Sequence, residues 1–371
     1  MSAAAAPAAA RVYVVVLNWN GWRDTVACLE SVLRSDHPAY QVVVCDNASG
    51  DGSLARLAAW AGGEPVAPEP DPHDSLVALV SPPLPKPVPH AVLTRAEAER
   101  GGTAACDAAR VVFVQAGANL GYAGGCNVGL RYALARGDAP YVWVLNNDTV
   151  VAPDALSALV RRMAERPDAG QCGSRLLYYD APGRVQTWGG ATYNPWLGTM
   201  RQLGEGEPAA AAPSVADVER RTDYVCGASV LVRRGFLERV GLMAEDYFLY
   251  FEELDWARRG HAFARAYAHG SVVYHREGRS IGTSADSRRR SVVADYYGLR
   301  NRLRFTRRFF PLAFPVVYCG VAGAALNRLL RRQFRRAAMV VGILVGRGSP
   351  PMPTAPPRRG GAADPRDLAP S

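Results

Sequence analysis

The chain lacks the sequence motifs of several common kinds of site. Its seven cysteines lie far apart and no two of them form a CxxC pair, so neither a zinc site nor a dithiol redox motif is indicated. Several cysteines stand inside apolar runs, which favours buried thiols in a reducing compartment. Residues 1–10 are rich in alanine and contain no basic residue. We therefore expect a disordered N-terminus rather than a signal peptide, and a folded part that faces the cytoplasm.

Lysine is also nearly absent, and arginine carries the positive charge. Lys86 is the single lysine in 371 residues with a formal net charge of +9. Between positions 276 and 336 there are fifteen arginines and three acidic residues, so this segment accounts for more than the whole net charge. Such a block indicates an anionic partner, either phosphates, an acidic membrane surface or nucleic acid. Because no nucleic-acid recognition motif accompanies it, we expect no nucleic-acid partner.

The basic block surrounds an apolar stretch at 309–326, which is near the minimum length for a membrane span and contains two prolines. The flanking arginines favour a helix that lies in the plane of an anionic membrane, or re-enters it, over a full span. A buried C-terminal helix is the alternative. We expect a basic, helical, membrane-associating extension at 276–346 and a disordered tail at 347–371.

Strand and helix patterns alternate at short intervals through the first half of the chain, which predicts an α/β fold with a mainly parallel, Rossmann-like sheet and flanking helices. Buried strands are expected at 12–17, 41–45, 111–115, 141–145 and 172–177. Residues 62–104 are rich in proline and show little periodicity, so they are expected to be a flexible insertion. Residues 179–223 are expected to be irregular.

Polar residues follow the predicted strands, and in a parallel sheet such positions share the edge where ligands bind. Asp148 can give a hard oxygen ligand to a divalent cation that neutralises a diphosphate, or it can cap the helix near Pro153. Asp46 can accept a hydrogen bond from the N3–H of uracil or thymine, or close an Asx turn. His275 ends a later apolar run and is either a nitrogen ligand to the metal or a structural histidine.

Two further segments bear on the chemistry. Residues 119–129 form a glycine-rich turn before a helix, whose amides can approach phosphate or sugar oxygens. They do not form the GxGxxG dinucleotide fingerprint. Glu252, Glu253 and Asp255 stand among five aromatic residues. Adjacent carboxylates among aromatics raise each other's proton affinity, which suits a general base that deprotonates an attacking hydroxyl, although an acidic first helical turn is the alternative.

Taken together and in order, these motifs resemble those of inverting family 2 glycosyltransferases of the GT-A fold, in particular the bacterial rhamnosyltransferase-like members. The resemblance covers roughly residues 12–308 without the proline-rich insertion. The motifs that carry it are Val-Leu-Asn-Trp-Asn (16–20), Cys-Asp-Asn-Ala-Ser-Gly-Asp-Gly-Ser (45–53), Asn-Leu-Gly-Tyr-Ala-Gly-Gly-Cys-Asn-Val-Gly (119–129), Leu-Asn-Asn-Asp-Thr (145–149), Tyr-Phe-Glu-Glu-Leu-Asp (250–255), His275 and Tyr-Tyr-Gly-Leu-Arg-Asn-Arg (296–302).

The resemblance implies a role for each site residue. Asp148 and His275 would bind a divalent metal, Mg²⁺ or Mn²⁺. Glu253, or its neighbour Glu252, would be the catalytic base of a single in-line displacement with inversion. The residues expected to bind the nucleotide-sugar donor are Asn18, Asn20, Asp46, Asn47, Asn119, Gly121, Asn127 and Asn147. The candidates for the acceptor side are Trp188 and Asp255.

Two motifs depart from the family pattern. The metal motif reads Asn-Asn-Asp rather than Asp-x-Asp, so Asp148 would be its only charged ligand, and the base motif reads Glu-Glu where Glu-Asp is usual. A catalytically degenerate, membrane-associated glycan-binding or scaffold protein is therefore the alternative. A nucleotidyltransferase is disfavoured, because it would need a glycine-rich basic loop after the first strand, where this chain has Asn-Trp-Asn-Gly-Trp (18–22).

The resemblance predicts a GT-A catalytic domain at 11–275. It would transfer a sugar from dTDP-rhamnose or a UDP-sugar to a hydroxyl of a growing cell-surface glycan or lipid-linked acceptor. The expected location is the inner face of the plasma membrane, to which the arginine-rich segment would bind.

Overall fold

The computed structural model describes residues 10–65, 74–276, 291–348 and 350–351. Most of the two segments expected to be disordered, 1–10 and 347–371, lies outside the described residues. So does 277–290, which is part of the arginine-rich block.

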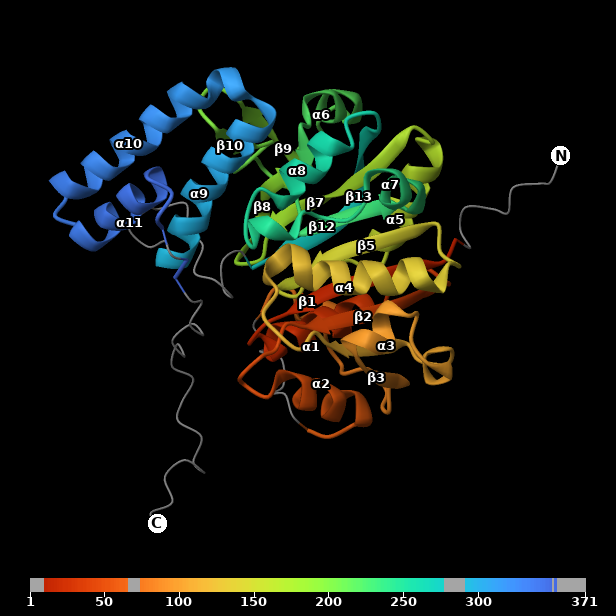
Figure 1. Ribbon diagram of the computed structural model, residues 1–371. Helices are drawn as coiled ribbons and strands as arrows, with labels where there is room; N and C mark the ends of the chain where they lie inside the picture. Colours follow the sequence, from red (N-terminus) through yellow and green to blue (C-terminus); the bar gives the residue numbers. More distant parts are fainter. Residues whose placement is uncertain (1–9, 66–73, 277–290, 349, 352–371) are drawn as a thin grey trace, which may run out of the picture.

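A large sheet forms the centre of the molecule (Figure 1). Its strand order is β3-β4-β2-β1-β5-β12-β7-β13-β6, with β8 paired to β7. From β3 to β5 every neighbour is parallel, as are β7 and β13, while β12, β6 and β8 run antiparallel to their partners. The strands of this sheet are β1 (Val12–Asn18), β2 (Tyr40–Asp46), β3 (His90–Thr94), β4 (Val111–Gln115), β5 (Tyr141–Asn146), β6 (Thr149–Val151), β7 (Ala169–Tyr178), β8 (Ala181–Trp188), β12 (Ser229–Arg233) and β13 (Ala264–His275).

Helices cover both faces of this sheet, and the predicted α/β class with a mainly parallel sheet is confirmed. The helices that cover the sheet are α1 (Trp22–Val32), α2 (Ser53–Gly62), α3 (Arg95–Glu99), α4 (Gly121–Arg136), α5 (Ala155–Glu165), α7 (Arg234–Val240) and α8 (Glu252–Arg259). A smaller sheet holds β9 (Gly190–Asn194), β10 (Thr199–Gln202) and β11 (Tyr224–Val225), and α6 (Val215–Arg221) lies nearby in sequence.

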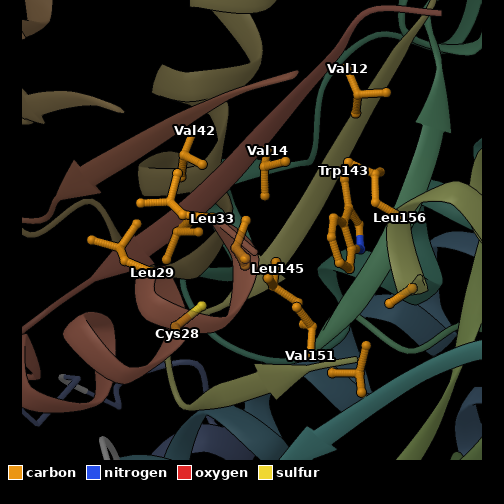
Figure 2. Packing of buried hydrophobic residues seen from close by; sticks show 14 of the residues in the cluster. Val12, Val14, Cys28, Leu29, Leu33, Val42, Trp143, Leu145, Val151 and Leu156 are labelled. Atoms are coloured by element: carbon orange, nitrogen blue, oxygen red, sulfur yellow. The ribbon is translucent and has the colours of Figure 1, made fainter. Parts of the chain in front are cut away.

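Strand periodicity divides the core between the two faces. Val12, Val14 and Val16 pack toward α1, α2 and α5, whereas Tyr13 and Val15 pack toward α4 and α7. Figure 2 shows the first of these clusters, where Trp143 lies among aliphatic side chains. Its indole N–H donates to Ser229 Oγ at 2.9 Å. The buried β-branched runs therefore make a rigid platform for the polar residues that follow each strand.

Two expectations about irregular segments are wrong. Residues 90–94 of the proline-rich insertion form the edge strand β3, because Ala91 and Leu93 face the core and the capping box of Thr94 and Glu97 starts α3. Residues 179–223 contain β8, β9, β10 and α6. Their strands are stabilised by partners distant in sequence, so local periodicity did not reveal them.

A helical region follows the sheet, as predicted. It consists of α9 (Val292–Phe309), α10 (Phe314–Leu330) and α11 (Phe334–Leu344). The three helices pack on one another through an apolar cluster and stand to one side of the central sheet (Figure 1). One face of α9 contacts the segment before α8, which connects the helical region to the candidate site.

Candidate active site

The carboxyl ends of β1 and β2 bring Asn18 and Asp46 together, because the two residues are partners in the parallel register. The Asn18 amide donates to the Asp46 carboxylate at 2.7 Å, and the Ser49 hydroxyl donates to the same oxygen at 2.6 Å. The Thr25 hydroxyl of α1 donates to the side-chain oxygen of Asn18, Oδ1, at 2.9 Å. Asn18 and Asp46 are both buried. This group of polar side chains, the donor floor, is ordered by its own hydrogen bonds.

Asn20 and Asn147 border the donor floor. The backbone N–H of Asn20 donates to Ser49 Oγ at 2.8 Å, and its side-chain oxygen accepts from the Gly50 N–H at 2.8 Å. The Asn147 amide donates to Thr25 Oγ1 at 3.0 Å. These contacts connect the turn after β5 to the turns after β1 and β2.

Asn47 extends the donor floor to the glycine-rich turn. Its amide nitrogen donates to Asn119 Oδ1 at 3.1 Å and to the Gly121 carbonyl at 3.0 Å, while its oxygen accepts from the Leu120 N–H at 3.1 Å. A cavity of about 60 Å³ opens beside these residues, with Trp19 among its lining side chains. The sequence motifs at 45–53 and 119–129 therefore meet in one place.

Asp148 and His275 form a pair beyond the end of β5. The strand pairing of β13 with β6 sets His275 opposite Thr149, and His275 Nε2 lies 3.2 Å from Asp148 Oδ1. The other ring nitrogen, Nδ1, lies 2.9 Å from Gln186 Oε1. Since that oxygen only accepts, Nδ1 carries a proton and, in the neutral ring, Nε2 directs its lone pair toward Asp148.

A lone pair and a carboxylate oxygen that converge in this way fit a divalent cation. The amide of Asn146 lies 3.5 Å from His275 Nε2 and adds polar character. Within the described residues, no three His, Cys, Asp or Glu side chains are grouped to hold a metal. A cation at Asp148 and His275 would therefore need water or ligand oxygens to complete its shell, which Mg²⁺ commonly takes.

Arg276 follows this pair, and its guanidinium is paired with nearby carboxylates. Its backbone N–H donates to the Asp148 carbonyl at 2.9 Å, and its guanidinium lies 3.7 Å from the centroid of the Tyr179 ring and 2.9 Å from an Asp24 oxygen. Sequence reasoning missed the local roles of Arg276 and Gln186. The position of Arg276 directly after His275 was a signal for the first, whereas Gln186 lies in the segment taken as irregular.

The segment before α8, 247–251, has an unusual backbone. Phe248, Tyr250 and Phe251 have φ angles of 65°, 66° and 76°, a region that costs non-glycine residues about 1–3 kcal/mol each. We call this segment the aromatic loop. Glu252 follows it directly, so the conformation of the loop sets the direction in which the side chains of Glu252 and Glu253 point from the start of α8.

Glu252 and Glu253 are adjacent carboxylates in an apolar setting. Glu252 is 2% exposed, and within the described residues its Oε2 atom has no hydrogen-bond partner. Burial, followed by the charge of Glu253, raises the pKa of Glu252 well above its ordinary value. Burial also raises the pKa of Glu253, which is partly exposed. A carboxylate with increased proton affinity that retains access to solvent is suited to accept a proton from a hydroxyl.

One short turn, residues 227–228, connects Glu253 to the Asp148–His275 pair. The Glu253 carboxylate packs so closely on Gly227 that a methyl group there would overlap it. The next residue, Ala228, accepts a hydrogen bond from the Asn146 N–H at 3.0 Å. Glu253 and the Asp148–His275 pair therefore flank the same turn, although Asp148 and Glu253 are more than a hundred residues apart in sequence.

Three predicted site residues lie elsewhere. Asn127 uses both atoms of its amide on the backbone of Met243. Trp188 is 3% exposed within an apolar cluster, and Asp255 is fully buried, where it accepts from two arginine side chains at 2.6 and 2.9 Å. The structure therefore does not support donor contact for Asn127 or acceptor contact for Trp188 and Asp255.

Residues 101–209 match the model of glycosyl transferase family 2. This segment of the chain therefore resembles family 2 glycosyltransferases. The chain is similar to a low-salt glycan biosynthesis hexosyltransferase, Agl10, of Haloferax volcanii, with 23% identity over 42% of this chain. It is also similar to N-acetylglucosaminyl-diphospho-decaprenol L-rhamnosyltransferase of Mycobacterium tuberculosis, with 29% identity over 46% of this chain. The matches span 47% and 61% of those two relatives.

The fold is shared with solved structures of glycosyltransferases. One of them, GalNAc-T7 with UDP, GalNAc and Mn²⁺, matches with a TM-score of 0.53 and 13% identity, over 85% of this chain and 51% of that one. At this identity the likeness shows the fold alone. The rhamnosyltransferase-like family 2 resemblance and the predicted GT-A fold are both confirmed.

Proposed function

We propose that this chain is an inverting, metal-assisted glycosyltransferase that moves a sugar from a nucleoside-diphosphate donor to an acceptor hydroxyl. The observation that carries the proposal is the turn at 227–228, where partly exposed Glu253 lies on one side and the Asp148–His275 pair is reached through Asn146 on the other. A base and a cation that act on one anomeric carbon must be neighbours, and this turn connects the residues proposed for the two roles.

The residues divide the reaction between them. The donor floor binds the nucleotide, with Asp46 as an acceptor for a pyrimidine N3–H. Asp148 and His275 would hold a divalent ion, which would supply positive charge to the leaving diphosphate. Glu253 takes the proton from the acceptor hydroxyl as that oxygen attacks the anomeric carbon. Because one displacement occurs, the product has the opposite anomeric configuration and no covalent sugar–enzyme intermediate forms.

The relatives suggest the substrates. The Mycobacterium tuberculosis relative is named for L-rhamnosyl transfer to N-acetylglucosaminyl-diphospho-decaprenol, which favours dTDP-rhamnose as donor and a lipid-linked acceptor here. A UDP-sugar satisfies the same contact at Asp46. GalNAc-T7 is named with Mn²⁺, which supports Mn²⁺ as well as Mg²⁺.

We further propose that residues 276–346 hold the catalytic domain on an anionic membrane. The stretch Pro311–Leu330 is apolar and long enough for a span, and only 22% of it is buried. At the turn between α10 and α11, exposed Leu326, Leu330 and Phe334 stand beside exposed Arg331 and Arg335. Apolar side chains rimmed by arginine fit a surface-lying helix pair at the inner face of the plasma membrane.

The activity is tested by incubating the full chain with dTDP- and UDP-sugars, Mg²⁺ or Mn²⁺ and a lipid-diphosphate acceptor. We expect release of nucleoside diphosphate that depends on acceptor and metal. Release of pyrophosphate would indicate nucleotidyl transfer instead. Binding of nucleotide without turnover of any donor would favour the glycan-binding or scaffold alternative.

Membrane binding is tested by flotation with vesicles that contain anionic or only zwitterionic lipid. We expect binding to the anionic vesicles that survives moderate salt and is lost when Leu326 and Leu330 are both changed to glutamate. Equal flotation of that variant would contradict the proposed surface.

A further inference from the structure

The motif Tyr-Tyr-Gly-Leu-Arg-Asn-Arg at 296–302 lies outside the residues that touch substrate in the proposed reaction. It occupies α9, and its Asn301 is fully buried at the point where α9 meets the aromatic loop. The Asn301 amide nitrogen donates to the carbonyls of Tyr247, Leu249 and Tyr250 at 2.8, 2.7 and 3.1 Å. One side chain thus binds three backbone oxygens within four residues.

These carbonyls belong to the part of the loop with left-handed backbone. Phe248 and Tyr250, at φ 65° and 66°, would relax toward ordinary backbone angles without an external restraint. Asn301 supplies that restraint from the C-terminal side. Its own oxygen accepts from the Arg300 guanidinium at 2.9 Å, which fixes which way the amide faces.

The opposite side of the aromatic loop is held by the glycine-rich turn at 119–129, which borders the donor floor. The Tyr122 N–H donates to the Phe248 carbonyl at 2.7 Å, and a side chain at Gly121 would overlap that carbonyl. The Phe248 ring stacks on Tyr297 of α9, with centroids 4.9 Å apart. The loop is therefore clamped between the glycine-rich turn that follows Asn119 and the helix that carries Asn301.

We propose that Asn301 is a positioning residue for the catalytic base. It fixes the aromatic loop so that the side chains of Glu252 and Glu253, at the start of α8, stay shielded from water and in a productive orientation. This inference rests on the proposed function. It assigns to the helical region a role in catalysis that is separate from membrane binding. Loss of the three hydrogen bonds would let the loop relax and water reach the glutamates, while Asn18 and Asp46 stay held by Thr25 and Ser49.

The test compares Asn301→Leu, which removes the amide, with Asn301→Gln, which keeps the donors but displaces them by one methylene. We expect kcat to fall about 10–100-fold for leucine and less for glutamine, because small displacements of a catalytic group cost rates of this order. The donor KM should stay within about twofold. The acid limb of the kcat profile should move to lower pH, because hydration lowers the pKa of a buried carboxyl.

Leu303→Ala is the matched control, since Leu303 lies on the same helix but packs toward α10. It should leave kcat, the acid limb and the aromatic loop near wild type. Hydrogen exchange at 247–251 gives a readout that needs no turnover: it should accelerate in both Asn301 variants and not in Leu303→Ala. Wild-type exchange at the loop, or an unchanged kcat and acid limb in folded Asn301→Leu, would overturn the inference. Accelerated exchange in a protein that transfers no sugar would support the clamp and reject the proposed function.

Discussion

Asp46 and Glu252 are both buried carboxylates, yet their surroundings differ in kind. Asp46 accepts from Asn18 and from Ser49. Glu252 follows a loop of left-handed residues, and within the described residues its Oε2 atom has no partner. The donors around Asp46 fix its position, whereas burial, followed by the charge of Glu253, raises the proton affinity of Glu252. We call the donor floor the donor half of the site and the two glutamates its base half. In the proposed reaction the first binds the donor and the second transfers the proton.

The largest effect should come from the base half. Glu253→Gln keeps the shape of the side chain but removes its capacity to take a proton, so kcat should fall about 10²–10⁴-fold. Affinity for nucleoside diphosphate should stay within about twofold, because the donor floor is intact. Steady-state kinetics and titration calorimetry measure the two. More than a tenth of wild-type kcat would remove Glu253 from the role of base, and Glu252→Gln would then be the variant to compare.

The donor half should respond in the opposite way. Asp46→Asn removes a charged acceptor, and hydrogen bonds to charged groups contribute about 1.5–3 kcal/mol, so the donor KM should rise roughly 10–100-fold. The value of kcat should change little. Ser157→Ala serves as control, because Ser157 of α5 donates to exposed Asp36, in the connection between α1 and β2, and to no residue of the donor floor. A fall in kcat with unchanged donor KM would show that the two halves are not separable.

A substitution at Gln186 tests whether Asp148 and His275 form a metal site. Gln186→Leu removes the acceptor that keeps the proton on Nδ1 of His275, and loss of such a partner weakens metal binding about 10–100-fold. We expect the lower end of that range, because Asp148 remains. Activity measured against Mn²⁺ concentration gives the apparent affinity. If the variant matches wild type across the titration, His275 is not a ligand.

The smallest effect concerns stability. The folded-state pKa of Glu252 is raised, so the folded protein binds more protons than the unfolded chain between the ordinary pKa of about 4.3 and the raised one. Stability contributed by this group is therefore lost as the pH rises through that window. Glu252→Gln should match wild type near pH 4 and be more stable by about 1–3 kcal/mol above the window. Urea unfolding at several pH values measures this, and a pH-independent difference would argue against a protonated Glu252.

The sequence predicts the parallel half of the fold well, because its strands are local β-branched runs that end at polar turns. The meeting of Asn18 with Asp46 follows from that half alone. The strand β8, with its Gln186, was missed since it depends on pairing with β7. The burial of Trp188 and Asp255 was missed for the same reason: their neighbours come from segments distant in sequence. Asn301 could be noticed as part of a motif, but its three carbonyl partners depend on a strained loop that no periodicity predicts.

The most direct measurement is a crystal structure of the full chain with Mn²⁺ and a nucleoside diphosphate, in which anomalous scattering locates the ion. Our account predicts one strong peak within coordination distance of Asp148 Oδ1 and His275 Nε2, with diphosphate oxygens completing its shell and Glu253 across the turn at 227–228. A bound nucleotide whose Mn²⁺ is held by other residues, with no ion at Asp148 Oδ1 and His275 Nε2, would contradict it.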